Sequence, residues 1–151
     1  MGVEQAVFKG LLTAAKADTG GSGLYGETSA NRLYGGFKLQ GEDMRTHDLP
    51  RIEVAPPINS RMDASGQDIW TGLWRMRVMV QRDRAFGTGD TPENAGVLSG
   101  IMDRVNAVFD KATITLGSGT ASTLSINRVI PGPENENTVV RIIEFTILVC
   151  E

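Results

Sequence analysis

Apolar residues recur at helical spacing in two segments of this chain. Between residues 2 and 17 they lie three or four positions apart, with charged and polar residues between them, which predicts an amphipathic helix. Asp18-Thr19-Gly20-Gly21 then provides residues that suit a left-handed helix end. A second helix is predicted from the same spacing up to Ala112. Thr91-Pro92-Glu93-Asn94 would start it with a capping hydroxyl, a proline at the first helical position and an acid in the first turn.

Strict alternation of apolar and polar residues predicts strands in the remaining chain. The clearest runs from Ile69 to about Arg82, and at about 14 residues it exceeds the usual strand length and is expected to project beyond the core. Thr138–Cys150 alternates in the same way. Pro131-Gly132-Pro133 and a polar tip at residues 135–137 separate it from a further strand, which favours an antiparallel pair. Shorter strands are predicted at 32–34, 37–39, 49–54 and 123–130, with long loops at 20–30 and 56–68.

These elements define a fold class. Two helices are most economically packed together on one face of the sheet. We therefore predict a single α+β domain over residues 1–151: a mainly antiparallel β-sheet with two amphipathic helices packed on one face. The sequence contains no internal repeat and no domain linker.

Composition narrows the class of protein. The chain has 15 basic and 18 acidic residues, a net charge of −3 and a pI near 5.2, whereas a free-standing nucleic-acid binder is usually basic. The single cysteine, Cys150, excludes an intrachain disulfide and is expected as a small buried side chain, which fits a reducing cytoplasm or an assembly without disulfides. Met1–Leu12 does not resemble a signal peptide, and no apolar run is long enough to span a membrane.

The residues that usually carry catalysis do not cluster. The only histidine, His47, lies in a polar stretch with Asp43, Arg45 and Asp48, and no second histidine or cysteine is near enough in sequence to complete a metal site. We expect a solvated loop histidine, because a catalytic base needs an orienting partner and a pocket. Ser60, Ser65 and Ser99 have no nucleophile-elbow context.

Anion and calcium sites are equally unsupported. Gly87-Thr88-Gly89-Asp90-Thr91 precedes a helix but lacks the lysine of a P-loop, and its acids would repel a phosphate. The pairs Asp43/Asp48 and Asp63/Asp68 match no calcium loop and are expected as exposed loop acids. The sequence therefore predicts no catalytic, metal-binding or cofactor-binding residues, no cofactor and no enzyme activity.

Arginines are the best candidates for function. Four of them lie within ten residues with one acid among them, and those at 75 and 77 share a strand face. Three interpretations remain open: a solvated sheet face with cross-strand partners such as Glu144, an inter-subunit surface, or a nucleic-acid stripe. A tryptophan near the strand start packs in the core or serves an interface. The candidate subunit-interface residues are Arg75, Arg77, Arg82, Arg84 and Trp70.

The order of the elements carries a resemblance to a family. A helix opening Met-Gly-Val-Glu-Gln-Ala-Val, a Gly-rich loop leading to Arg32-Leu33-Tyr34, and Leu49-Pro50-Arg51-Ile52-Glu53-Val54 come first. The strand Trp74–Arg82, the helix Ala95–Ala112 and two closing strands follow. This arrangement resembles the tail-terminator or tail-completion proteins of long-tailed bacteriophages and related prophages. The resemblance spans nearly the whole chain. It consists of the order of the elements and their general residue pattern, without a diagnostic motif.

The resemblance implies a structural virion protein at the head–tail junction, assembled in the host cytoplasm. Six copies would form a ring that caps the tail tube, stops its polymerisation and joins the head. DNA would pass through the ring without sequence-specific binding. The implied partners are further copies of the chain in a hexamer, the tail tube protein and a neck or head-completion protein, with no membrane. Extended loops or an arm would contact neighbouring subunits.

Other functions stay open at this stage. The chain could instead be a head-completion or neck protein, the head–tail connector next to the terminator ring. A small-ligand-binding domain with a cleft around His47, and a nucleic-acid-binding module that uses the arginine-rich strand, are the remaining alternatives.

Overall fold

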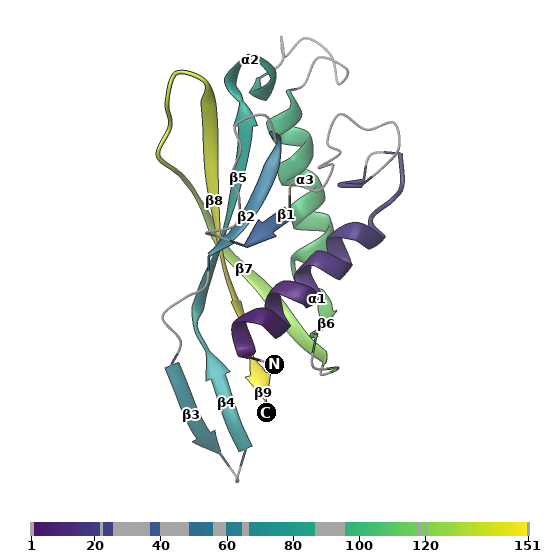
Figure 1. The fold of residues 1–151 in the computed structure, drawn as a ribbon, viewed down its shortest axis with the longest axis vertical. Coiled ribbons are helices and arrows are strands. Elements are labelled where there is room, and N and C mark those ends of the chain that lie inside the picture. Colours follow the sequence, from purple (N-terminus) through teal and green to yellow (C-terminus); the bar gives the residue numbers. More distant parts are fainter. Residues whose placement is uncertain are drawn as a thin grey trace.

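The residues that the structure describes form a large sheet, a small sheet and three helices. The computed structural model describes residues 2–21, 23–25, 37–39, 49–55, 60–64, 67–86, 96–117, 119 and 121–150, with the backbone alone for residues 60–64, 67–71 and 150. In chain order the elements are α1 (Val3–Ala17), β1 (Phe37–Leu39), β2 (Arg51–Ala55), β3 (Ser60–Ala64), β4 (Gln67–Thr71), β5 (Leu73–Gln81), α2 (Arg82–Ala85), α3 (Val97–Phe109), β6 (Thr113–Thr115), β7 (Ala121–Pro131), β8 (Thr138–Ile147) and β9 (Val149–Cys150) (Figure 1).

The large sheet has the strand order β1-β2-β5-β8-β7-β6. Its neighbouring strands are antiparallel except for β1 and β2, which are parallel. Helices α1 and α3 cover one face of this sheet (Figure 1). The predicted fold class is therefore confirmed: an α+β fold with a mainly antiparallel sheet and two amphipathic helices on one face.

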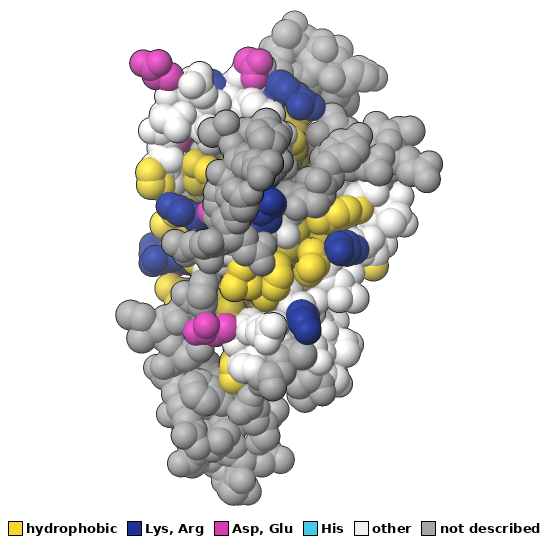
Figure 2. All heavy atoms as spheres, in the orientation of Figure 1, with side chains coloured by type: hydrophobic (Ala, Val, Ile, Leu, Met, Phe, Trp, Pro, Cys, Tyr) yellow, Lys and Arg dark blue, Asp and Glu magenta, His cyan; other side chains and the backbone are white. Residues whose placement is uncertain are grey.

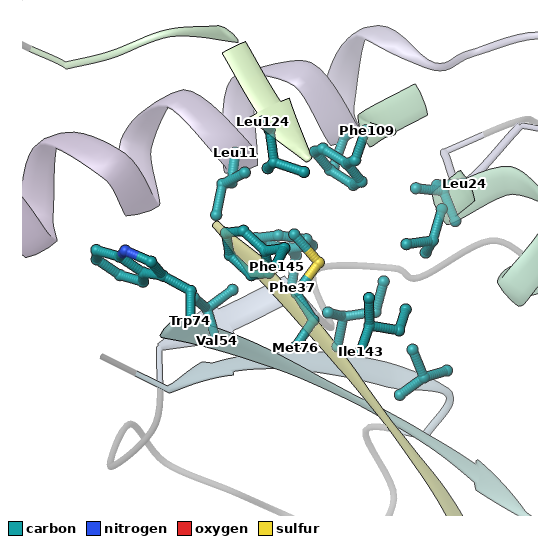
Figure 3. Packing of buried hydrophobic residues seen from close by; sticks show 14 of the residues in the cluster. Leu11, Leu24, Phe37, Val54, Trp74, Met76, Phe109, Leu124, Ile143 and Phe145 are labelled. Atoms are coloured by element: carbon teal, nitrogen blue, oxygen red, sulfur yellow. The ribbon is translucent and has the colours of Figure 1, made fainter. Parts of the chain in front are cut away.

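The core lies between these helices and the sheet. Leu11 of α1 and Phe109 of α3 point towards the sheet, where Phe145 of β8 lies beneath them (Figure 3). Trp74 of β5 stacks on Phe145 with ring centroids 6.2 Å apart, and none of these four side chains is appreciably exposed. Their burial follows from the helical spacing on α1 and α3 and the alternation on β5 and β8.

Helix α1 also covers the β6 edge of the sheet. A Cβ atom at Gly10 would lie 2.7 Å from the carbonyl oxygen of Thr115, so only glycine allows this close approach. Just beyond β6, the backbone N–H of Gly117 donates to the carbonyl of Ala6 at 2.9 Å. The edge strand is thus protected by a helix, which is one way in which proteins prevent unwanted strand pairing.

An ion pair fastens the end of α1 to α3. The Asp18 carboxylate accepts hydrogen bonds from Nε of Arg104 at 3.1 Å, from its Nη2, and from the backbone N–H of Leu24 at 2.8 Å. Burial raises the pKa of Asp18, but the bonds from Arg104 and Leu24 outweigh it and hold the pKa below its usual value. The helix ends where the sequence predicted, although Asp18 itself has a φ of −83° and is not left-handed.

A small sheet of order β3-β4-β9 extends the large one. In it Trp70 pairs with Val149, while in the large sheet Leu73 pairs with Thr146. The two positions are three residues apart along each strand, with two residues between them, so the register is unchanged across the break. The predicted strand from Ile69 to about Arg82 and its C-terminal partner are therefore two segments each, interrupted at single residues, and β4 projects below the body of the molecule (Figure 1).

Three predicted boundaries are wrong. Residues 60–64, expected within a loop, form β3, which pairs antiparallel with β4 and places Asp63 opposite Asp68 on strands and not in loops. Helix α3 begins at Val97, because Gly96 directly before it is extended. The chain turns after Phe109, so the helix stops short of Ala112 and the unpredicted strand β6 follows. The predicted strand at 32–34 and the helix start Thr91–Asn94 lie outside the described residues.

Candidate interaction surface

The face of the large sheet turned away from α1 and α3, called the open face below, carries charged side chains among apolar ones. On β5 the predicted alternation is confirmed, because Trp74 and Met76 are buried against the helices while Arg75 and Arg77 lie on the open face. The side chain of Arg75 is 54% exposed and that of Arg77 is 33% exposed. Strand alternation thus presents both predicted arginines on one surface.

Two arginines flank one buried carboxylate on this face. Glu144 of β8, with a side chain only 3% exposed, accepts hydrogen bonds from Nε of Arg128 at 2.8 Å and from its Nη2 at 3.3 Å. Nε of Arg75 approaches it from the other side at 3.5 Å. The hydrogen bond from Arg128 is the main cause that lowers the pKa of Glu144, and burial opposes it. The predicted partnership of the arginine strand with Glu144 is therefore confirmed for Arg75.

A second carboxylate is buried on the neighbouring strand. Glu53 of β2 contacts Nε of Arg51 at 2.9 Å, and both of these side chains are almost fully buried. Nη1 of Arg77 lies 3.9 Å from the same carboxylate. Both acids of this part of the open face are thus beneath the surface, and the arginines nearest to solvent are Arg75 and Arg128.

Two leucines lie beside the ion pairs that Arg75 and Arg128 form with Glu144. Leu73 is 41% exposed and Leu148 is 51% exposed. Leu73 pairs with Thr146, two residues before Leu148, so the two leucines are diagonal neighbours on the open face. An exposed aliphatic pair next to exposed arginines has the composition of a protein-binding surface.

The other predicted interface residues lie elsewhere. Arg82, at the start of α2, fastens the loop between β7 and β8, because it contacts Glu134 at 3.2 Å and donates to the Asn135 carbonyl at 2.9 Å. Hydrogen bonds from Arg141 and then from Arg82 lower the pKa of Glu134. Arg84 is exposed on α2. Trp70 belongs to β4, and its side chain is outside the described part of the chain.

Sequence reasoning missed Arg128 as a member of this surface. The register of β7 against β8 shifts at Asn127, so that Ile126 faces Phe145 while Arg128 faces Glu144. In an uninterrupted pairing Arg128 would face Ile143, on the side of the helices. The β-bulge therefore turns the arginine onto the open face, and no pattern of apolar residues reveals a bulge.

Other sites can be considered only for the described residues. His47, Asp43 and Asp48, the loop 87–91 and the cleft suggested around His47 lie outside them. Within the described ranges, no group of three or more histidine, cysteine, aspartate or glutamate side chains could hold a metal ion. Among those same residues, no helix has the length and apolar character needed to cross a membrane.

Fold and surface together define an α+β domain with a helix-covered face and a charged open face. No family model matches the chain, and no curated protein matches it in sequence. Its structure is similar to a chain from a solved structure described as "Virion of native gene transfer agent (GTA) particle", with a TM-score of 0.70. The two are 12% identical, and the alignment covers 99% of this chain and 98% of the other. At this identity the similarity concerns the fold.

Proposed function

We propose that the protein is a structural component of a virion and not an enzyme. The observation that carries the proposal is the full-length match, at a TM-score of 0.70, to a chain of a gene transfer agent virion. A match that leaves almost no residue of either chain unaligned supports a similar role for the whole domain, although a shared fold alone does not specify function.

Within the virion, the role that we infer is that of a ring-forming tail terminator subunit. Six copies would cap the tail tube and join it to a neck or head-completion protein at the head–tail junction, and the ring would leave a channel through which DNA passes. The order of elements in the sequence supports this role through its resemblance to the tail-terminator family. The open face of the sheet supports it physically, because exposed arginines and leucines on one face suit contacts between subunits.

The test is to add the purified protein to tail tubes polymerised from the tube protein of the same particle. Electron microscopy should show a six-fold ring at one end of each tube, and the tubes should stop lengthening. The negative control is the variant Phe145→Ala, which is expected to weaken the fold. Tubes that continue to grow with no added density at their ends would contradict the terminator role. Binding to the head side of the junction without tube capping would assign the chain to the neck.

A further inference from the structure

Two arginines and one buried carboxylate on the open face leave one positive charge uncompensated. Arg75 of β5 and Arg128 of β7 approach the carboxylate of Glu144 from the strands on either side of it. Within the part of the chain that the structure describes, neither arginine forms another ion pair or hydrogen bond. Glu144 therefore neutralises only one of the two charges beside it.

Both arginines have hydrogen-bond donors left for a ligand outside the chain. A guanidinium carries five N–H donors, and the contacts with Glu144 involve only Nε of Arg75 and Nε and Nη2 of Arg128. The side chain of Arg75 is 54% exposed and that of Arg128 is 64% exposed. Their contacts with Glu144 restrict both side chains, which reduces the entropy lost when a ligand binds. A carboxylate, whose geometry matches arginine donors, would make the group neutral.

Exposed aliphatic side chains adjoin these arginines. Leu73, which is 41% exposed, lies two residues before Arg75 on the same face of β5, and Leu148, which is 51% exposed, follows β8 on the same side. A small anion alone would leave both leucines in water. A ligand with aliphatic side chains beside its carboxylate would also remove this apolar surface from water, which is favourable.

We propose that the patch formed by Leu73, Arg75, Arg128 and Leu148 binds a segment of a different protein, in which a carboxylate stands among aliphatic side chains. The carboxylate binds the remaining donors of the two arginines, and its aliphatic neighbours cover the two leucines. Charge complementarity and apolar burial thus select the same kind of partner. The inference goes beyond the proposed function, because it names the chemistry of a partner and holds whether or not the chain terminates a tail tube.

The charges of the described side chains argue against a second copy of the chain as the partner. Outside the open face these side chains are seven basic and seven acidic, so they provide no acidic excess to match the arginines. Two of the acids, Asp18 and Glu134, are already paired with arginines of their own chain. The partner is therefore a protein of different sequence.

The leucines argue against a nucleic acid as the partner. Phosphate groups contact cationic and polar side chains and leave exposed leucines unmatched. A protein segment covers them with its own apolar groups, and the arginines then form the polar part of the contact. The net charge of −3 also weakens the attraction of the chain for a polyanion.

The test probes the full chain with an array of short synthetic peptides in four composition classes. The variable residues are glutamate and leucine, glutamine and leucine, glutamate and serine, or glutamine and serine, each placed in many orders. The chain should bind the best peptides of the glutamate–leucine class at least about tenfold more tightly than those of any other class. Fluorescence anisotropy measures these affinities, and high salt should weaken them because the arginines are exposed.

An arginine variant tests the charges of the patch. Arg75→Gln with Arg128→Gln and Glu144→Gln removes two positive charges and one negative charge, so it leaves no buried carboxylate unpaired and lowers the net charge by one. The control, Lys16→Gln, lowers the net charge equally at an exposed position of α1. The variant should bind the strongest glutamate–leucine peptide at least about tenfold more weakly than the parent, and the control should bind it like the parent.

A leucine variant tests the apolar part of the patch. Leu73→Ser with Leu148→Ser changes only exposed side chains, and its control is Val129→Ser, a comparably exposed position on the helix side of β7. The same loss of peptide affinity is expected for the variant and none for the control. Circular dichroism verifies that each variant folds.

Four results would overturn the inference. The chain may show no preference for the glutamate–leucine class, or the patch variants bind its peptides as tightly as the parent does. Self-association of the chain that the patch variants lose, without peptide binding, would assign the patch to a second copy. Binding of a DNA duplex that is lost in the arginine variant and kept in the leucine variant would assign it to a nucleic acid. Because the peptide assay contains no tube protein, its result is independent of the tail-terminator role.

Discussion

The two faces of the large sheet are made by the same strands and differ in composition: the helix side is apolar, while the open face carries charged side chains among apolar ones. On the helix side, Trp74 and Phe145 are buried and stacked. On the open face, their strand neighbours Arg75 and Glu144 form an ion pair with each other. Because a slip of one residue would exchange the two faces, the apolar side fixes the register, and the register then determines which charges are presented. Figure 2 shows that basic and acidic side chains are scattered over the visible surface, with apolar side chains between them.

The largest expected effect lies on the helix side. Phe145→Ala removes a buried ring that stacks on Trp74, and we expect it to lower the free energy of unfolding by about 3–5 kcal/mol. Urea unfolding followed by circular dichroism measures the change. The matched control is Leu148→Ala on the open face, which should stay within about 0.5 kcal/mol of the parent. An equal loss of unfolding free energy in the two variants would contradict the difference between the two faces.

An intermediate effect is expected for the ion pair between the helices. Asp18→Asn should cost about 1–2 kcal/mol, since it weakens charged hydrogen bonds that solvent partly screens. The folded pKa of Asp18 is lower than usual, so its stabilisation is fully present above the ordinary pKa and is lost as the pH falls through the folded value. Unfolding measured from neutral pH to below about pH 4 should therefore show a shallower acid-side decline for the variant.

The control for that experiment is Asp103→Asn, at an exposed position of α3. It should leave both the stability at neutral pH and the slope on the acid side close to those of the parent. If Asp103→Asn flattens the slope as much as Asp18→Asn does, the pair with Arg104 is not its cause.

The smallest effect is expected on the open face. Arg75→Gln should change the free energy of unfolding by no more than about 0.5 kcal/mol, because Arg128 still pairs with Glu144. Adding Arg128→Gln leaves the buried carboxylate without either arginine, so the double variant should lose more stability than the sum of the single ones. A double-mutant cycle by urea unfolding measures this coupling, and strict additivity would show that the two arginines act independently.

Sequence patterns predicted the helix side well because packing produces them. The spacing on α1 and α3 and the alternation on β5 each require a continuous apolar stripe, so the helices, the long strand and the shared face of Arg75 and Arg77 could be predicted. Those features depend on local periodicity, and tertiary structure did not override them.

Features that depend on a single backbone position were missed. The bulge at Asn127, the interruption at Gly72 and the extended Gly96 leave no trace in the hydrophobic pattern. Strand β3 was missed because residues 60–64 contain few apolar residues and pair at one end of the molecule. The open face was therefore only half predicted: Arg75 and Arg77 were identified, while Arg128 was missed because its side of the sheet depends on the bulge.

The unchanged register between the two sheets has a mechanical consequence. The β4–β5 chain and the β8–β9 chain are both interrupted, at Gly72 and Leu148, while the pairing on either side stays in phase. Pairing that stays in phase fixes the position of the small sheet along the strands, because a slip of one residue would move every paired residue and exchange the two faces. The small sheet therefore continues the ribbon of β5 and β8 in register, and the buried Val149 joins it to the core of the body.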